Sequence, residues 1–72
     1  MKIVLLIITG LTGTGNPILT TEYMPADNQL VRVFAMQLCK ERANDLYRLH
    51  TKHMYTDMHY KCVVTDQYNH EL

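Results

Sequence analysis

Residues 2–17 read KIVLLIITGLTGTGNP, in which a run of apolar residues ends in three glycines within six positions. Three interpretations of this stretch are open: a phosphate-binding loop, a secretion signal, and a strand that ends in a turn. The first would make the chain a nucleotide-binding protein and the second an exported one. The third would make the stretch a permanent part of a small folded module.

A dinucleotide-binding loop requires the order G-x-G-x-x-G at the start of a helix, because the amides of the helix N-terminus hold the phosphates. Here the glycines follow the order G-x-x-G-x-G over residues 10–15, and Asn16-Pro17 comes next. Proline favours extended backbone in the residue before it, and residues 18–23 have the composition of a strand. The stretch therefore lacks the helix that phosphate binding needs.

Lys2 and the apolar residues 3–8 resemble the start of a secretion signal. The uninterrupted apolar core has six residues, fewer than the roughly 7–15 of a signal peptide, and no small-residue cleavage site follows. A membrane-spanning helix needs about 20 apolar residues. A short β-branched run bounded by turn residues instead predicts a strand buried on both faces, followed by a chain reversal.

Residues 30–34, LVRVF, are open to two interpretations. In the first, residues 18–23 form a strand, residues 24–29 form a turn, and residues 30–34 form the second strand of a β-hairpin. The rival is one helix, capped by Asp27 or Asn28, that runs to His50. We expect the hairpin, because such a helix is long for a domain of this size.

The second half of the chain predicts a helix followed by a strand. Residues 36–52 are helical under both interpretations, with an inward stripe formed by Cys39, Ala43, Leu46 and His50. Residues 60–65 alternate like a strand, with one face formed by Tyr60, Cys62 and Val64. Residues 66–72 are expected to be a frayed tail.

The expected fold is α+β: a small antiparallel sheet in the order β-β-β-α-β, with one helix packed on one face. The chain of 72 residues is expected to be a single domain. A chain this short buries only about 60% of the surface that its unfolded form exposes. We expect a second copy of the chain to cover the open face of the sheet, giving a homodimer.

The charge balance argues against nucleic acid as a partner. Seven basic residues balance seven acidic ones. Nucleic-acid binding usually needs a basic stripe, because phosphate neutralisation supplies most of the affinity. A net charge of zero also favours self-association.

Cys39 and Cys62 both fall on expected inward faces, one on the helix and one on a strand. A disulfide between them would contribute about 3–4 kcal/mol in the chain-entropy model. Two buried thiols are the alternative, which a cytoplasmic setting favours. Inward burial argues against nucleophilic catalysis by either thiol.

Neither a metal site nor an acid–base site is expected. The histidines and Cys62 have the spacing H-x2-H-x5-H-x2-C over residues 50–62, but His59 and Cys62 leave a strand on opposite faces. His50 is expected to be a partly buried, hydrogen-bonded core residue. No predicted element brings two carboxylates together among Glu22, Glu41, Asp45, Asp57 and Asp66.

The chain resembles the small uncharacterised accessory proteins of tailed phages. The resemblance lies in the opening MKIVLLIITGLTGTGNPI, in Phe34 shortly before Cys39-Lys40-Glu41, and in the closing Tyr60-Lys61-Cys62-Val63. It implies an accessory phage protein located in the cytoplasm of the bacterial host, and it implies nothing about catalytic residues.

The function expected first is a non-enzymatic module, without a cofactor, that binds and inhibits a bacterial host protein such as a defence effector. Tyr and Arg are frequent at interface hot spots, which makes Arg32, Tyr47 and Arg48 the candidate contact residues. An oligomeric protein that sequesters a nucleotide signal is the alternative, and it requires Arg32, Arg42 and Tyr47 to converge. A third hypothesis is an exported, disulfide-stapled module from which residues 1 to about 15 are removed.

Overall fold

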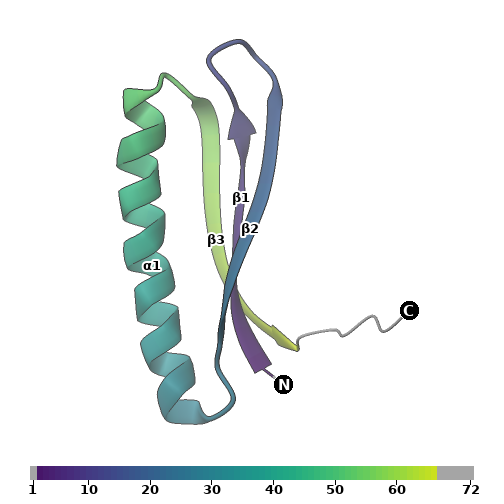
Figure 1. Ribbon diagram of the computed structural model, residues 1–72, viewed down its shortest axis with the longest axis vertical. Helices are drawn as coiled ribbons and strands as arrows, with labels where there is room; N and C mark the ends of the chain where they lie inside the picture. The colour runs from purple at the N-terminus through teal and green to yellow at the C-terminus, as the bar shows by residue number, and fades with distance from the viewer. Residues whose placement is uncertain (1, 67–72) are drawn as a thin grey trace, which may run out of the picture.

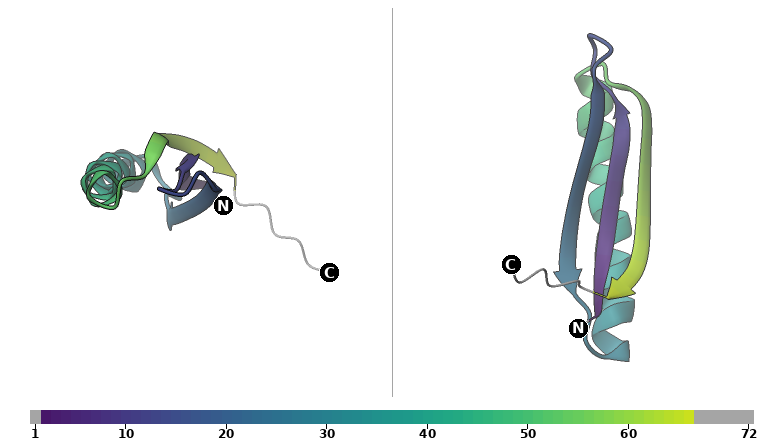
Figure 2. Two further views of the ribbon diagram at one scale, coloured as in Figure 1. Left: turned by 90° about the horizontal axis from the view of Figure 1, so that it is seen from above. Right: turned by 90° about the vertical axis from the view of Figure 1, so that its right-hand side faces the viewer.

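The structure, a computed structural model that describes residues 2–66, is an α+β domain with three strands and one helix (Figure 1). The elements follow the order β-β-α-β: β1 (Lys2–Leu11), β2 (Pro17–Pro25), α1 (Gln29–Lys52) and β3 (Thr56–Asp66). The sheet has the order β2-β1-β3, and β1 is antiparallel to both neighbours. Figure 2 shows this order from the side opposite α1, which packs behind the sheet. The expected α+β class, with an antiparallel sheet and one helix on one face, is confirmed.

The apolar run at the start of the chain forms the central strand β1. Its alternate residues Val4, Leu6 and Ile8 are buried against α1, and they form the core together with Ala26, Ala35, Cys39 and Leu46. Residues 12–16 then reverse the chain, with Gly15 at a φ of 88° and its N–H donating to the carbonyl of Thr12 at 2.9 Å. Glycine adopts this left-handed conformation without strain. The expected strand and glycine turn are therefore confirmed. Burial on both faces is not found within residues 2–66, because Leu5 and Ile7 on the face turned away from α1 are only half-buried.

The strand expected over residues 30–34 is wrong, because α1 already begins at Gln29. Asn28 caps the helix: its Oδ1 accepts a hydrogen bond from the N–H of Val31 at 2.9 Å. Such a cap satisfies one of the free amides of the first turn. Ala35, one helical turn before Cys39, continues the inward stripe, so burial overrides the strand preference of the valines.

α1 ends in a Schellman motif around Met54, which has a φ of 63°. The N–H of Met54 donates to the carbonyl of Thr51 at 3.1 Å, and the N–H of Tyr55 donates to that of His50 at 2.9 Å. The ring of Tyr55 also stacks on that of His50, with centroids 5.1 Å apart. A contact of this kind between the two ends of the motif is a common part of it.

β3 is longer than expected at both ends. It begins at Thr56, before the strand expected over residues 60–65, and it ends at Asp66, which was expected in the tail. Asp66 Oδ1 lies 3.1 Å from Lys2 Nζ, so an ion pair joins the end of β3 to the start of β1. The rest of the expected tail lies outside the described residues.

The face of the sheet turned away from α1 carries apolar side chains with no element over them among residues 2–66. Ile3, Leu5 and Ile7 of β1 lie on this far face; Ile3 is buried at the end of the strand, and Leu5 and Ile7 are half-buried. On β2 the same face carries Leu19 and Tyr23, whose exposed fractions are 75% and 61%.

Candidate interaction surface

The three expected contact residues lie on α1 and do not form one cluster. Arg32 and Tyr47 are 15 positions apart, which is about 22 Å along a helix axis. Arg32 lines one hollow beside β3 and Tyr47 lines a second, and the two hollows share Lys40 as a lining residue. Arg48 is exposed and lines neither hollow. The structure thus groups Arg32 and Tyr47 along one surface and leaves Arg48 outside it.

These two hollows share Lys40 and are here called, together, the α1–β3 groove. The first has a volume of about 490 Å³ and is lined by Arg32, Val33, Met36, Gln37, Lys40 and Val64. The second has a volume of about 610 Å³ and is lined by Lys40, Ala43, Asn44, Tyr47, Tyr60, Lys61 and Cys62. Every lining residue belongs to α1 or to β3, so the groove follows the line where the helix lies beside this edge strand.

The α1–β3 groove is lined by basic residues and by no carboxylate. Arg32, Lys40 and Lys61 belong to its lining, which contains neither Asp nor Glu. Arg32 is half-buried, and its Nε is buried without a hydrogen-bond partner among the described residues. The two ion pairs found in residues 2–66 join other side chains. The basic side chains of the groove are therefore left without an internal counter-charge in this part of the chain.

Two tyrosines and a histidine form an aromatic cluster at the second part of the groove. The rings of Tyr47 and Tyr60 meet edge to face, with centroids 6.2 Å apart. The hydroxyl of Tyr60 lies 2.6 Å from Nδ1 of His50, which confirms the partly buried, hydrogen-bonded role expected for His50. Burial raises the pKa of Tyr60, and Tyr47 adds to this shift. The strand period predicts Tyr60 on the inward face, but nothing in the sequence pattern indicates that it lines a surface groove.

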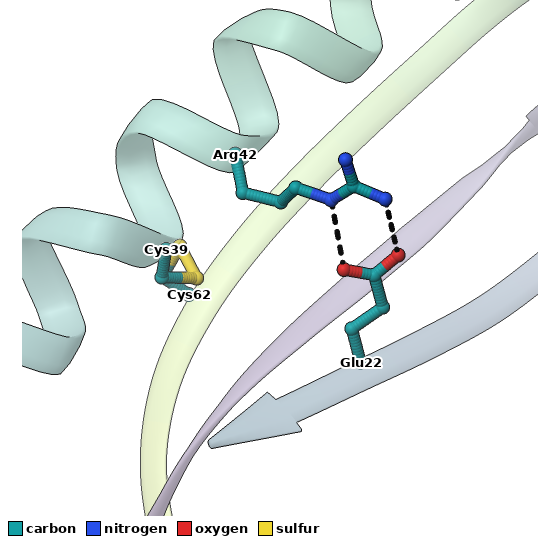
Figure 3. Close-up of polar contacts among 4 residues, drawn as sticks. All are labelled: Glu22, Cys39, Arg42 and Cys62. Carbon is teal, nitrogen blue, oxygen red and sulfur yellow. Dashed lines mark hydrogen bonds and ion pairs between the residues drawn. A yellow bond between two sulfur atoms is a disulfide. The ribbon is translucent and has the colours of Figure 1, made fainter.

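Arg42, which the nucleotide hypothesis required beside Arg32 and Tyr47, lies on another flank of α1 (Figure 3). Its Nε and Nη2 donate to the two carboxylate oxygens of Glu22 on β2, at 3.0 and 3.1 Å. This two-pronged hydrogen bond lowers the pKa of Glu22 and raises that of Arg42. Within one chain, Arg42 therefore serves to hold β2 against α1.

Cys39 and Cys62 form a disulfide between α1 and β3, next to the second part of the groove (Figure 3). Their Cα atoms are 6.2 Å apart, and Cys39 is fully buried. Of the two alternatives that the sequence left open, the structure has the bridge. It fixes the distance between the helix and the edge strand, and so the width of the groove between them.

The first turns of α1 present apolar side chains to solvent. Leu30 and Phe34 are four positions apart, with exposed fractions of 81% and 62%, and Val33 lies between them. Residues at this spacing lie on the same face of a helix. We call these three residues the α1 patch; through Val33 it adjoins the first part of the groove.

Among residues 2–66 no group of three or more His, Cys, Asp and Glu side chains is arranged to hold a metal ion. His59 and Cys62 lie on opposite faces of β3, as expected, since they pair with Thr9 and Leu6 of β1. In the same part of the chain, no helix has the length and the apolar character needed to cross a membrane. Comparisons with protein-family models, with curated proteins and with solved structures find no match.

Proposed function

We propose that this chain is a non-enzymatic protein-binding module that contacts its partner through the α1 patch and the adjoining α1–β3 groove. The observation that carries the proposal is the exposure of Leu30 and Phe34 on the same face of α1. Large apolar side chains gathered on an exposed face favour a protein partner, because contact with it removes them from water.

A bacterial host protein is the partner to search for, because the chain resembles accessory proteins of tailed phages. A small module of this kind acts by covering a surface that the host protein needs, and a defence effector is the expected target. Activity in the host cytoplasm belongs to the same proposal.

A pull-down from bacterial lysate with a double variant tests the proposal. Leu30→Asp with Phe34→Asp places two charges on the α1 patch and leaves the groove lining unchanged. We expect the wild type to retain a specific protein at physiological salt and the double variant to lose it. If the same proteins are retained by both, the α1 patch is not a binding surface.

Thr51→Asp is the matched control, because it adds negative charge at an exposed position of the same helix. Thr51 is 17 positions from Phe34, or about 25 Å along the axis. The control should retain the partner. Circular dichroism of the three proteins should coincide, since every changed side chain is exposed.

Self-association through the far face of the sheet is part of the proposal. The half-buried Leu5 and Ile7 lie in the middle of this face, and the exposed Leu19 and Tyr23 lie on β2. A second copy that packs on this face would remove them from water and leave α1 free on the outside. Sedimentation equilibrium should give the mass of a dimer, and Leu19→Asp should shift the protein towards the monomer; a monomeric wild type at high concentration contradicts this part.

The position of β1 weighs against removal of the first 15 residues as a signal. β2 and β3 each pair with β1 and not with one another, so cleavage would take away the strand that joins them, along with Val4, Leu6 and Ile8 of the core. The disulfide favours an oxidising compartment, which is the strongest support for the exported alternative. An intact mass that includes Lys2 would exclude this cleavage.

A further inference from the structure

We propose that the α1–β3 groove takes an acidic, extended segment of the partner, which adds to the outer edge of β3 as a fourth strand. The inference rests on the proposed protein-binding function and names the chemistry of the partner at one surface.

The outer edge of β3 offers main-chain groups for such a segment. β3 stands at the end of the sheet order, so among residues 2–66 only one of its sides is paired, with β1 (Figure 2). The groove is lined by three consecutive residues of this strand, Tyr60, Lys61 and Cys62. Consecutive side chains of a strand point to opposite faces. A hollow lined by all three therefore borders the edge of the strand, where an extended peptide donates and accepts main-chain hydrogen bonds.

The charges of the groove select an acidic segment. Its lining contributes the charges of Arg32 and Lys40 from α1, with no carboxylate among the lining residues. Lys61 of β3 also belongs to the lining, and its side chain leaves the edge strand on the far face, because Lys61 pairs with Ile7. None of the three takes part in an ion pair of the described chain. Carboxylates brought in by a partner would complement these charges and would repel a basic competitor.

The dimensions of the groove favour a strand over a compact ligand. From Arg32 to Tyr47 it follows α1 for about 22 Å, the length of about seven residues in extended conformation. Arg32 and Lys40 are eight positions apart, or about 12 Å along the helix. This spacing matches residues i and i+4 of a strand, which are about 13 Å apart and share one face. We therefore expect two acidic side chains four positions apart in the segment.

A synthetic peptide tests this inference with the full chain. The probe is an acetylated peptide of nine residues that alternates Thr and Val and carries Glu at its third and seventh positions. Titration followed by amide chemical shifts should move the amides of residues 60–64, and the affinity should fall as salt is raised. Two further peptides serve as controls, one with Lys in place of both Glu and one N-methylated at alternate residues. Both should bind at least about tenfold more weakly.

Charge reversal in the protein completes the test. Lys40→Glu, at an exposed position, should weaken binding of the Glu peptide severalfold, and adding Arg32→Glu should weaken it further. The double variant should prefer the Lys peptide over the Glu peptide. Arg48→Glu makes the same change in charge outside the groove and should bind like the wild type. Lys40→Glu alone keeps the test valid if the half-buried Arg32 position does not tolerate substitution.

Three results would overturn the inference: equal binding of the Glu and Lys peptides, undiminished binding of the N-methylated peptide, or absence of peptide binding at low salt. ATP titrated in parallel would reveal a nucleotide site if it moved the same amides while the Glu peptide did not, which also overturns it. The proposed function is judged separately by the α1 patch. In one outcome, the partner protein is lost by the Leu30→Asp, Phe34→Asp double variant and is still retained by Lys40→Glu. That result would support the proposed function and would reject the binding of an acidic strand in the groove.

Discussion

The hydroxyl of Tyr60 on β3 lies 2.6 Å from Nδ1 of His50 on α1, and the two rings are parallel to within 10° at a centroid distance of 5.9 Å. Tyr55, just after the helix, stacks on the same imidazole. One histidine near the end of α1 thus joins the helix, the chain reversal and the edge strand.

Tyr60→Phe keeps this ring and removes the hydrogen bond. We expect a loss of about 1 kcal/mol in the free energy of unfolding, measured by urea denaturation at neutral pH. Folding raises the pKa of Tyr60 above its ordinary value of 10.0. Tyr60 therefore makes its full contribution to the free energy of unfolding below pH 10.0, and this contribution is lost as the pH rises through the folded pKa. The difference between wild type and variant should therefore shrink at strongly alkaline pH. A difference that grows there would contradict the assignment.

The disulfide between Cys39 and Cys62 closes a loop across 23 positions. Replacing both cysteines by alanine should lower the free energy of unfolding by about 3–4 kcal/mol, since the unfolded chain regains the freedom that the bridge removes. Reduction of the wild type should have a similar effect, and the intact mass should rise by about two units on reduction. Unfolding curves that coincide with and without reductant would show that the bridge does not stabilise the fold.

Met54 occupies the position of the Schellman motif where glycine is usual. Its φ of 63° is left-handed, and its side chain is 76% exposed, so it contributes little burial there. Met54→Gly should raise the free energy of unfolding by about 1 kcal/mol. Met54→Ala, which keeps a Cβ, is the control and should give no such gain. A glycine variant less stable than the alanine variant would contradict the argument.

Gly10 of β1 lies against Met58 of β3. The two strands lose their register between Thr9 and Leu11, and Asp57 nearby has a φ of 53°. A Cβ on Gly10 would meet the thioether of Met58 and lie 3.1 Å from its Cα. Gly10→Ala should therefore cost about 1–3 kcal/mol in thermal or urea unfolding.

Met58→Ala provides the matched test of this contact. It removes the thioether and leaves the Cα in place, so the double variant should be more stable than the sum of the two single losses predicts. Strict additivity would show that the contact with Met58 is not the cause.

Glu22 and Arg42 should make stability depend on pH in the acid range. The hydrogen bond from Arg42 lowers the pKa of Glu22 below its ordinary value of 4.5. Glu22 therefore contributes to the free energy of unfolding above pH 4.5, and this contribution is lost as the pH falls through the folded pKa. Glu22→Gln should be slightly less stable than the wild type at pH 7 and indistinguishable from it in strong acid. Both side chains are about half exposed, so high salt should also reduce the difference.

Local chemistry accounts for the parts of the fold that sequence analysis predicted. Six consecutive apolar residues after Lys2 favour burial, and the glycines and Asn16 that follow favour a turn, so the hairpin of β1 and β2 could be predicted from the sequence. The inward stripe from Cys39 to His50 and the alternation from Tyr60 to Val64 follow in the same way from the helical and strand periods.

The start of α1 and the candidate surface depended on contacts between distant residues. Val31 and Val33 prefer strands, yet burial of Ala35 and the cap from Asn28 place them in a helix, an outcome that intrinsic preference does not reveal. The groove exists because α1 packs beside β3, and this packing makes Arg32, Tyr47 and Lys61 lining residues. Arg42 lies on another flank of α1, where it is hydrogen-bonded to Glu22. Periodicity predicts which side chains of a helix or strand share a face. Which other element packs against that face depends on the tertiary structure.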